Sequence, residues 1–184
     1  MSTMRTVALT KESTKDILEN LLKRSPNNYG KFESAVDEIL HKVKTEGDSA
    51  LFAYTKEFDK TEITADTIKV TEEEIKEAYE AVDPALIDVI RKALVNIRSY
   101  HEKQRQNSWF TSETNGTMLG QKVTALERVG VYVPGGKAVY PSSVLMNIVP
   151  AKVAGVDQIV MTTPPGKDGK VNPSTLVAAK EAGA

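Results

Sequence analysis

Arg128-Val-Gly-Val-Tyr-Val-Pro-Gly-Gly-Lys-Ala-Val-Tyr-Pro-Ser-Ser143 is the stretch that decides the fold, and an apolar run over residues 144–156 follows it. Its valines at positions 129, 131 and 133 alternate along the chain, as in a strand with one buried face. Pro134 ends that strand, because proline has no backbone N–H for a sheet to use. The apolar run favours a helix, so the stretch predicts a strand, a glycine turn and a helix.

The turn between this strand and this helix decides whether a ligand can approach the backbone. Pro134 and Gly135 fit the two central positions of a type II turn, which would put Gly135 at a positive φ. Ser142 or Ser143 is a suitable N-cap for the helix. A strand that ends in such a turn presents free backbone N–H groups, and α/β folds use this arrangement to bind nucleotides at the carboxyl end of the sheet.

The glycine spacing does not match the common phosphate-binding motifs. It is not G-x-G-x-x-G, and Lys137 is followed by Ala138, where a Walker A loop needs serine or threonine for Mg²⁺. The pattern therefore leaves two interpretations open, a nucleotide-binding turn and a tight turn without a ligand. Tyr132 faces away from the valines, so it is either a half-buried strand tyrosine or a contact at the lip of a cleft.

The composition excludes several classes of protein. The chain has 184 residues, 40% hydrophobic and 27% charged, which is typical of a folded chain and not of a disordered one. Its formal net charge of -1 predicts no attraction to nucleic acid or to an anionic membrane, and no apolar run reaches the ~20 residues of a membrane helix. There is no cysteine, which excludes disulfides and thiolate chemistry and fits a cytoplasmic protein.

The chain changes character near residue 126, from helical and charged to a βαβα order. Thr71 and Glu74 fit a capping box, and Asp83-Pro84 and Asn172-Pro173 fit helix starts. We predict an α/β fold, with the helix-rich part of an incomplete α/β domain at residues 1–126 and the start of a Rossmann-like domain at residues 127–184. The expected elements are helices over 10–24, over 32–58 with an interruption at Gly47, and from 72, 84 and 173; strands over 68–70, 121–126, 129–133 and 158–163; and a loop or hairpin over 108–120.

Few side chains are placed for catalysis or metal binding. His41 and His101 are the two histidines, and their wide separation gives no metal-ligand spacing. Glu72-Glu73-Glu74 is best explained as negative charge at a helix N-terminus. Trp109-Phe110 lies in a polar loop, where it either anchors a partner subunit or packs back on its own chain.

Four segments resemble the histidinol dehydrogenase family. They are the central stretch continued through Gly155, Phe58-Asp-Lys60, Asn96-Ile-Arg-Ser-Tyr-His-Glu102 and Thr162-Thr-Pro-Pro165. The resemblance runs from about residue 30 to the last residue. It covers only the amino-terminal part of the family's chain, which is typically more than twice as long.

The resemblance implies part of an NAD-dependent, zinc-requiring enzyme that oxidises L-histidinol through histidinaldehyde to L-histidine in histidine biosynthesis. It also implies a cytoplasmic homodimer. By the same resemblance Tyr132 contacts NAD, whereas the zinc ligands and the general base lie in the later half of the family's chain. This chain would then contribute no catalytic and no metal-binding residue. The alternative is a non-catalytic nucleotide-binding or dimerisation module that shares the same loop.

We expect the purified chain to retain far less than one zinc ion after dialysis, and not to reduce NAD with L-histidinol when zinc is added. A tight zinc site needs three or four converging N, S or O side chains, and His41 and His101 are not placed to converge. Metal analysis and the absorbance of NADH measure the two parts. Stoichiometric zinc, or turnover above a buffer blank, would contradict them.

Overall fold

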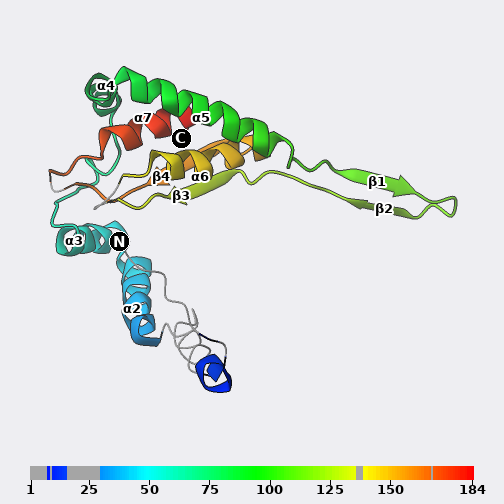
Figure 1. The fold of residues 1–184 in the computed structure, drawn as a ribbon, viewed down its shortest axis with the longest axis horizontal. Helices are drawn as coiled ribbons and strands as arrows, with labels where there is room; N and C mark the ends of the chain where they lie inside the picture. Colours follow the sequence, from blue (N-terminus) through cyan, green and yellow to red (C-terminus); the bar gives the residue numbers. More distant parts are fainter. Residues whose placement is uncertain (1–7, 9, 16–29, 136–138, 167) are drawn as a thin grey trace. The chain divides into compact units, whose positions relative to one another are not determined.

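The computed structural model describes residues 8, 10–15, 30–135, 139–166 and 168–184. The chain forms two compact units, residues 1–51 and 52–184, and each is described by itself (Figure 1). Of the helix predicted over 10–24, residues 11–15 are helical and the remainder from residue 16 lies outside the described residues. The other elements are α2 (Gly30–Glu46), α3 (Asp48–Phe58), α4 (Glu72–Ala81), α5 (Pro84–Glu102), β1 (Trp109–Ser112), β2 (Met118–Gln121), β3 (Arg128–Tyr132), α6 (Pro141–Ala154), β4 (Gln158–Thr162) and α7 (Pro173–Ala182).

The helix predicted over 32–58 is interrupted at Gly47, as the sequence indicates. Gly47 has a φ of 63°, which ends α2 and lets α3 begin one residue later. The apolar side of α2 is exposed at Phe32, Val36 and Leu40. α2 therefore has an apolar side that the described residues leave exposed at these three positions.

The second unit is built on two parallel strands. β3 pairs with β4 in the register that places Val131 opposite Met161, and α6 is the crossover between the strands. Val131 and Val133 point toward the hydrophobic core, whereas Tyr132 points to the other face, as the alternation predicts. The βαβα order of this part of the chain confirms the predicted α/β class.

α6 contributes fully buried side chains to the core of this unit. Its sequence is apolar on most sides, and Val144, Leu145, Ile148 and Val149 are fully buried. It packs against β3, α5 and α7, and Figure 1 shows these helices on one side of the strands. A helix that is apolar on most sides needs cover on most sides, and α5 and α7 provide it where the strands do not, although Met146 stays 52% exposed.

α4, α5 and α7 begin where the sequence predicts. In the capping box of α4, Thr71 Oγ1 accepts from the N–H of Glu74 at 3.1 Å, and Glu74 Oε2 accepts from the N–H of Thr71 at 2.8 Å. Asp83 and Asn172 cap α5 and α7, each accepting from the N–H two residues later, at 2.8 and 2.9 Å. These local signals were strong because each one satisfies a backbone donor that the helix leaves free.

Two predicted strands are absent from the described residues. Residues 68–70 form no strand, because Thr64 and Thr67 close a turn there, with Thr67 N donating to Thr64 O at 3.1 Å. Residues 122–126 form no strand either, since β2 already ends at Gln121. Both stretches have β-branched residues, but neither has a partner strand among the described residues, and propensity alone does not form a strand.

The start of α6 also differs from the prediction. Neither Ser142 nor Ser143 is its N-cap; Tyr140 holds that position and Pro141 is the first helical residue. Proline already has the helical φ and has no N–H to satisfy, so the helix starts at Pro141, without a side-chain cap.

Residues 108–120 contain a hairpin, one of the two predicted alternatives. β1 and β2 are antiparallel with Phe110 opposite Gly120, and all their residues are exposed. The Phe110 ring covers Gly120, where a Cβ would overlap it. Trp109 and Phe110 are both exposed, so they do not pack back on the rest of the described chain.

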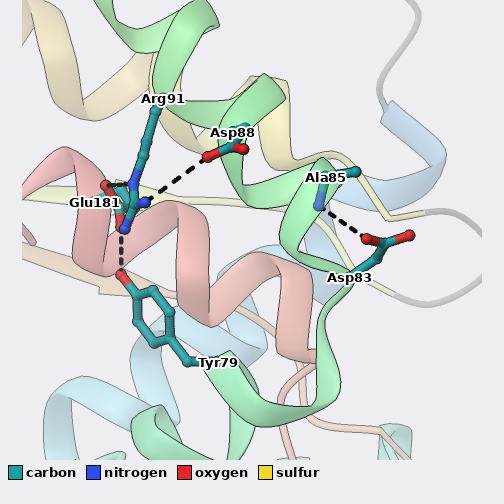
Figure 2. Close-up of polar contacts among 6 residues, drawn as sticks. All are labelled: Tyr79, Asp83, Ala85, Asp88, Arg91 and Glu181. Carbon is teal, nitrogen blue, oxygen red and sulfur yellow. Dashed lines mark hydrogen bonds and ion pairs between the residues drawn. The ribbon is translucent and has the colours of Figure 1, made fainter.

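A polar cluster ties α7 to α4 and α5 (Figure 2). Glu181 on α7 accepts from Arg91 Nε at 3.1 Å and Nη2 at 2.8 Å, and from the Tyr79 hydroxyl at 2.8 Å. The bond from Arg91 is the main reason why the pKa of Glu181 is lowered. Burial, and then the bond to Glu181, raises the pKa of Tyr79 to about 12. The fold thus stabilises an ionised carboxylate and a neutral phenol.

We expect Glu181→Gln to lower the free energy of unfolding by about 1 kcal/mol at pH 7. The Glu181 side chain is 16% exposed, but that of Arg91 is 55% exposed, so water screens the pair. Because folding lowers the pKa of Glu181, its stabilisation is present above the unfolded pKa of ~4.3 and is lost as pH falls through the folded pKa. Urea denaturation should therefore separate wild type and variant at pH 7 and not in acid.

Glu77→Gln is the matched control. Glu77 pairs with Lys170 at 2.8 Å, but its side chain is 63% exposed, so we expect no measurable loss. A similar loss in the two variants would show that the partly buried geometry around Glu181 adds nothing to the stability.

Candidate functional site

The carboxyl ends of β3 and β4 open on a hollow of about 320 Å³. Ligands of open α/β sheets bind at this edge, because the loops that follow parallel strands converge there. Its walls come from the turn after β3, the loop after β4 and the first turn of α7. They include Pro134, Gly135, Thr163, Pro164, Asn172 and Thr175.

Gly135 is needed in this wall for a reason that differs from the prediction. Its φ is not positive, so Pro134 and Gly135 do not form the predicted type II turn. A Cβ on Gly135 would lie 3.2 Å from the carbonyl oxygen of Pro164 and 3.6 Å from Thr163 Oγ1. The missing side chain therefore lets the turn after β3 lie against the loop after β4. Gly136, the other glycine of the turn, lies outside the described residues.

Tyr132 ends β3 beside this hollow but does not line it. It pairs with Thr162 across the two strands and is 63% exposed. It is thus not the half-buried strand tyrosine that the pattern alone favours. Its ring stands free on the face of the strands that the helices leave uncovered.

The charges that line the hollow have partners. Lys170 Nζ lies 2.8 Å from Glu77 Oε2, and this bond is the main reason why the pKa of Lys170 is raised. Asp168 Oδ1 accepts from the backbone N–H of Lys170 at 3.2 Å. These contacts leave the described wall of the hollow without an unpaired cation for a phosphate.

The two helices that begin at this edge differ at their N-termini. In α7, Asn172 accepts from the N–H groups of Ser174 and Thr175 at 2.9 and 3.0 Å, and Pro173 has none to offer. α6 has no side-chain cap, and its first-turn bonds go to the carbonyl of Tyr140. The positive end of α6 is therefore less well satisfied than that of α7.

A second hollow, of about 670 Å³, lies at the opposite end of β3, between the last turns of α5 and α6. His101 lines it as part of the last turn of α5, with Nδ1 2.7 Å from Gln104 Oε1. Its Nε2 is buried and has no partner in the described structure. His41 is exposed on α2, so the two histidines belong to different units.

The described residues contain no group of three or more histidine, cysteine, aspartate or glutamate side chains that could hold a metal ion. Within the same residues no helix is both long enough and apolar enough to cross a membrane.

Known proteins share this sequence over most of its length. The family model of histidinol dehydrogenase matches residues 22–184. The histidinol dehydrogenase of Bacillus subtilis (strain 168) is 59% identical over 148 residues, which are 80% of this chain and 34% of that protein. The histidinol dehydrogenase of Heliobacterium mobile is 53% identical over 165 residues, 90% of this chain and 39% of that protein.

A solved structure of the same family is also similar to this chain. The crystal structure of histidinol dehydrogenase from Elizabethkingia anophelis matches with a TM-score of 0.76 at 36% identity, over 83% of this chain and 35% of that chain. This chain spans little more than a third of the length of these relatives. Since the matches include the parallel strands, the turn after β3 and the loop after β4, the chain belongs to the histidinol dehydrogenase family.

Proposed function

We propose that this chain is the amino-terminal part of an NAD-dependent histidinol dehydrogenase, which oxidises L-histidinol to L-histidine. The family match supports the reaction. The main support for a cofactor-binding role of this amino-terminal part is the exposed Tyr132 ring. Tyr132 lies at the carboxyl end of β3, two residues before a turn that lies against the next loop. This is the cofactor side of the cleft in our proposal.

The residues at this edge fit a dinucleotide. Tyr132 offers an aromatic face and a hydroxyl, and the uncapped start of α6 offers a partial positive charge to a pyrophosphate. NAD, when bound, supplies the acceptor for the hydride that leaves the substrate. The chain's own part is to bind and orient that cofactor, since none of its described residues is placed as a general base beside the hollow.

Zinc does not fit the described residues. They hold no group of three candidate ligands, and the two histidines lie in different units. We therefore derive no zinc-dependent step for this chain and place the zinc ligands and the general base in the remainder of the intact enzyme. A Rossmann-like second domain starting near residue 127, a homodimer and a cytoplasmic location complete the proposal.

The exposed hairpin favours one alternative, a non-catalytic dimerisation module. Trp109 and Phe110 present aromatic surface that nothing in the described chain covers, which is typical of a protein interface. Histidinol-dependent NAD reduction by the complete translated protein would decide for the enzyme. Dimerisation of a product no longer than this chain, without that activity in any context, would decide for the module.

In the intact enzyme, Tyr132→Ala should weaken NAD binding by roughly 1–2 kcal/mol, or about 5- to 30-fold in Kd. Tyr132→Phe keeps the ring and should lose less. Tyr100→Ala, on α5, is the matched control, because Tyr100 is 62% exposed and Tyr132 is 63% exposed. Calorimetric titration with NAD measures the effect, and wild-type affinity in a folded Tyr132→Ala protein would remove Tyr132 from the site.

We expect Gly135→Val to weaken NAD binding and to lower the melting temperature, because its Cβ would press on the Pro164 carbonyl at 3.2 Å and push the turn away from the next loop. Gly130→Ala is the control, since a Cβ there meets nothing within 4 Å. The same titration and a thermal scan compare the two. Equal behaviour of the two variants would mean that the contact between turn and loop does not shape the site.

A further inference from the structure

Thr61 joins the segment after α3 to the loop after β4. Its hydroxyl oxygen Oγ1 donates to the carbonyl oxygen of Gly166 at 3.0 Å, across 105 residues of sequence. Thr61 is only 7% exposed, although it is polar and lies outside any helix or strand. Its methyl group lies beside Gly169, where a Cβ would be 3.5 Å from it. A buried hydroxyl that bonds a distant carbonyl in this way holds the two segments together.

The loop that accepts this bond is closed by its own backbone. The N–H of Gly166 donates to the carbonyl of Lys170 at 2.8 Å, and the N–H of Gly169 donates to the carbonyl of Gly166 at 2.9 Å. The Gly166 carbonyl therefore accepts one bond from within the loop and one from Thr61, which uses both of its lone pairs. Because the loop already holds its own shape, the Thr61 bond determines where the loop lies.

The backbone just before Thr61 has an unfavourable conformation. Lys60 has a φ of 60° and is the one non-glycine residue with a positive φ in the part of the chain that the structure describes. Asp59 still donates its N–H to the carbonyl of Thr55 at 2.9 Å, so Lys60 is the residue that leaves the helical path of α3. A side chain with a Cβ stays in such a conformation only where the surrounding structure requires it. Here the conformation leads directly into Thr61 and its bond.

Two prolines connect this loop to the edge where β3 and β4 end. Pro164 and Pro165 stand directly before Gly166, and the ring of each one fixes its φ. The carbonyl of Pro164 would lie 3.2 Å from a Cβ on Gly135, so this segment contacts the turn after β3. With two of its torsions fixed, the segment has little freedom to absorb a movement of Gly166. A shift of the loop therefore reaches the turn.

We propose that Thr61 is a positioning residue of the enzyme, whose bond to the Gly166 carbonyl holds the loop after β4, and with it the turn after β3, in the arrangement needed for turnover with NAD. Thr61 is not among the described residues that line the hollow, so it acts through the loop and not by contact with a ligand. The inference rests on the proposed function and adds to it a residue that lies before both strands.

The kinetic test uses the intact enzyme with Thr61→Val, which keeps the shape of the side chain without the hydroxyl, and Thr61→Ala, which cannot introduce a clash. We expect both variants to raise KM for NAD about fivefold or more, the effect of losing one hydrogen bond. kcat and KM for L-histidinol should stay within about twofold of wild type, because the bond contacts no reacting group. Thr61→Ser keeps the hydroxyl and should return KM for NAD to within about twofold of wild type.

Two matched controls test whether the effect is specific to the Thr61 bond. Thr45 on α2 also donates its hydroxyl to a carbonyl, that of His41, at 3.0 Å, so Thr45→Val removes the same kind of bond elsewhere. Glu77→Gln removes the ion pair with Lys170 of the same loop, whose side chains are 63% and 58% exposed and therefore screened by water. KM for NAD should stay within about twofold of wild type in both controls.

Nuclear magnetic resonance of the 184-residue chain tests the positioning without any activity. In Thr61→Val the backbone amide signals of Gly169 and Gly135 should both shift, because the loop and the turn are expected to move together. In Thr61→Ser both signals should stay close to those of wild type. A shift of the Gly169 signal alone would contradict the inference, since the bond would then hold the loop and not the turn.

An unchanged KM for NAD in folded Thr61→Val enzyme would also overturn the inference. A merely structural threonine would lower the melting temperature of that variant and leave KM for NAD as it is. The proposed function fails separately, if the wild-type intact enzyme does not reduce NAD with L-histidinol. In that event the amide signals still decide whether Thr61 positions the turn.

Discussion

The burial of α6 between the two strands and the helices α5 and α7 is the constraint on which the second unit depends. Val144 and Ile148 have no exposed surface, and burying one such side chain contributes about 1.5–3 kcal/mol. α6 connects two parallel strands and must therefore lie against them, so its outer side needs α5 and α7. The same packing explains why α4 and α5, which precede the hairpin, belong to one compact unit with strands that follow it. Glu181, Arg91 and Tyr79 then fix the angle of α7 over that core with bonds that hydrophobic packing alone does not direct.

The positions of α6 and α7 determine the arrangement of the loops at the edge where β3 and β4 end. The turn after β3 leads into α6, the loop after β4 leads into α7, and both segments meet where Gly135 touches Pro164. The packing of the core therefore positions the loops that form this site, and no glycine motif is needed for that. In our proposal, the uncapped start of α6 and the close contact between the two loops take the place of the phosphate-binding motifs that the sequence lacks.

Much of this architecture follows from local signals. Thr71, Asp83 and Asn172 could be recognised as caps because each satisfies a specific backbone donor, and the valines of β3 alternate with a period that only a strand has. The predictions that are wrong concern positions whose conformation depends on a residue or strand far away in the sequence. Residues 68–70 had strand propensity but no neighbouring strand, and Gly135 was assigned a turn conformation when its real constraint is Pro164, far along the chain.

The uncovered face of β3 and β4 limits how the rest of the enzyme can pack on these strands. Parallel strands are normally buried on both faces, yet Tyr132 and Val160 are exposed here, and the relatives are more than twice as long as this chain. That cover cannot be uniform if Tyr132 contacts a cofactor. Gly130 lies on the same face as Tyr132, two residues before it and opposite Val160, and a Cβ there would meet nothing within 4 Å. The backbone of Gly130 is therefore uncovered beside the tyrosine ring. We expect the rest of the enzyme to cover Val160 and to leave the Tyr132 ring accessible to the cofactor.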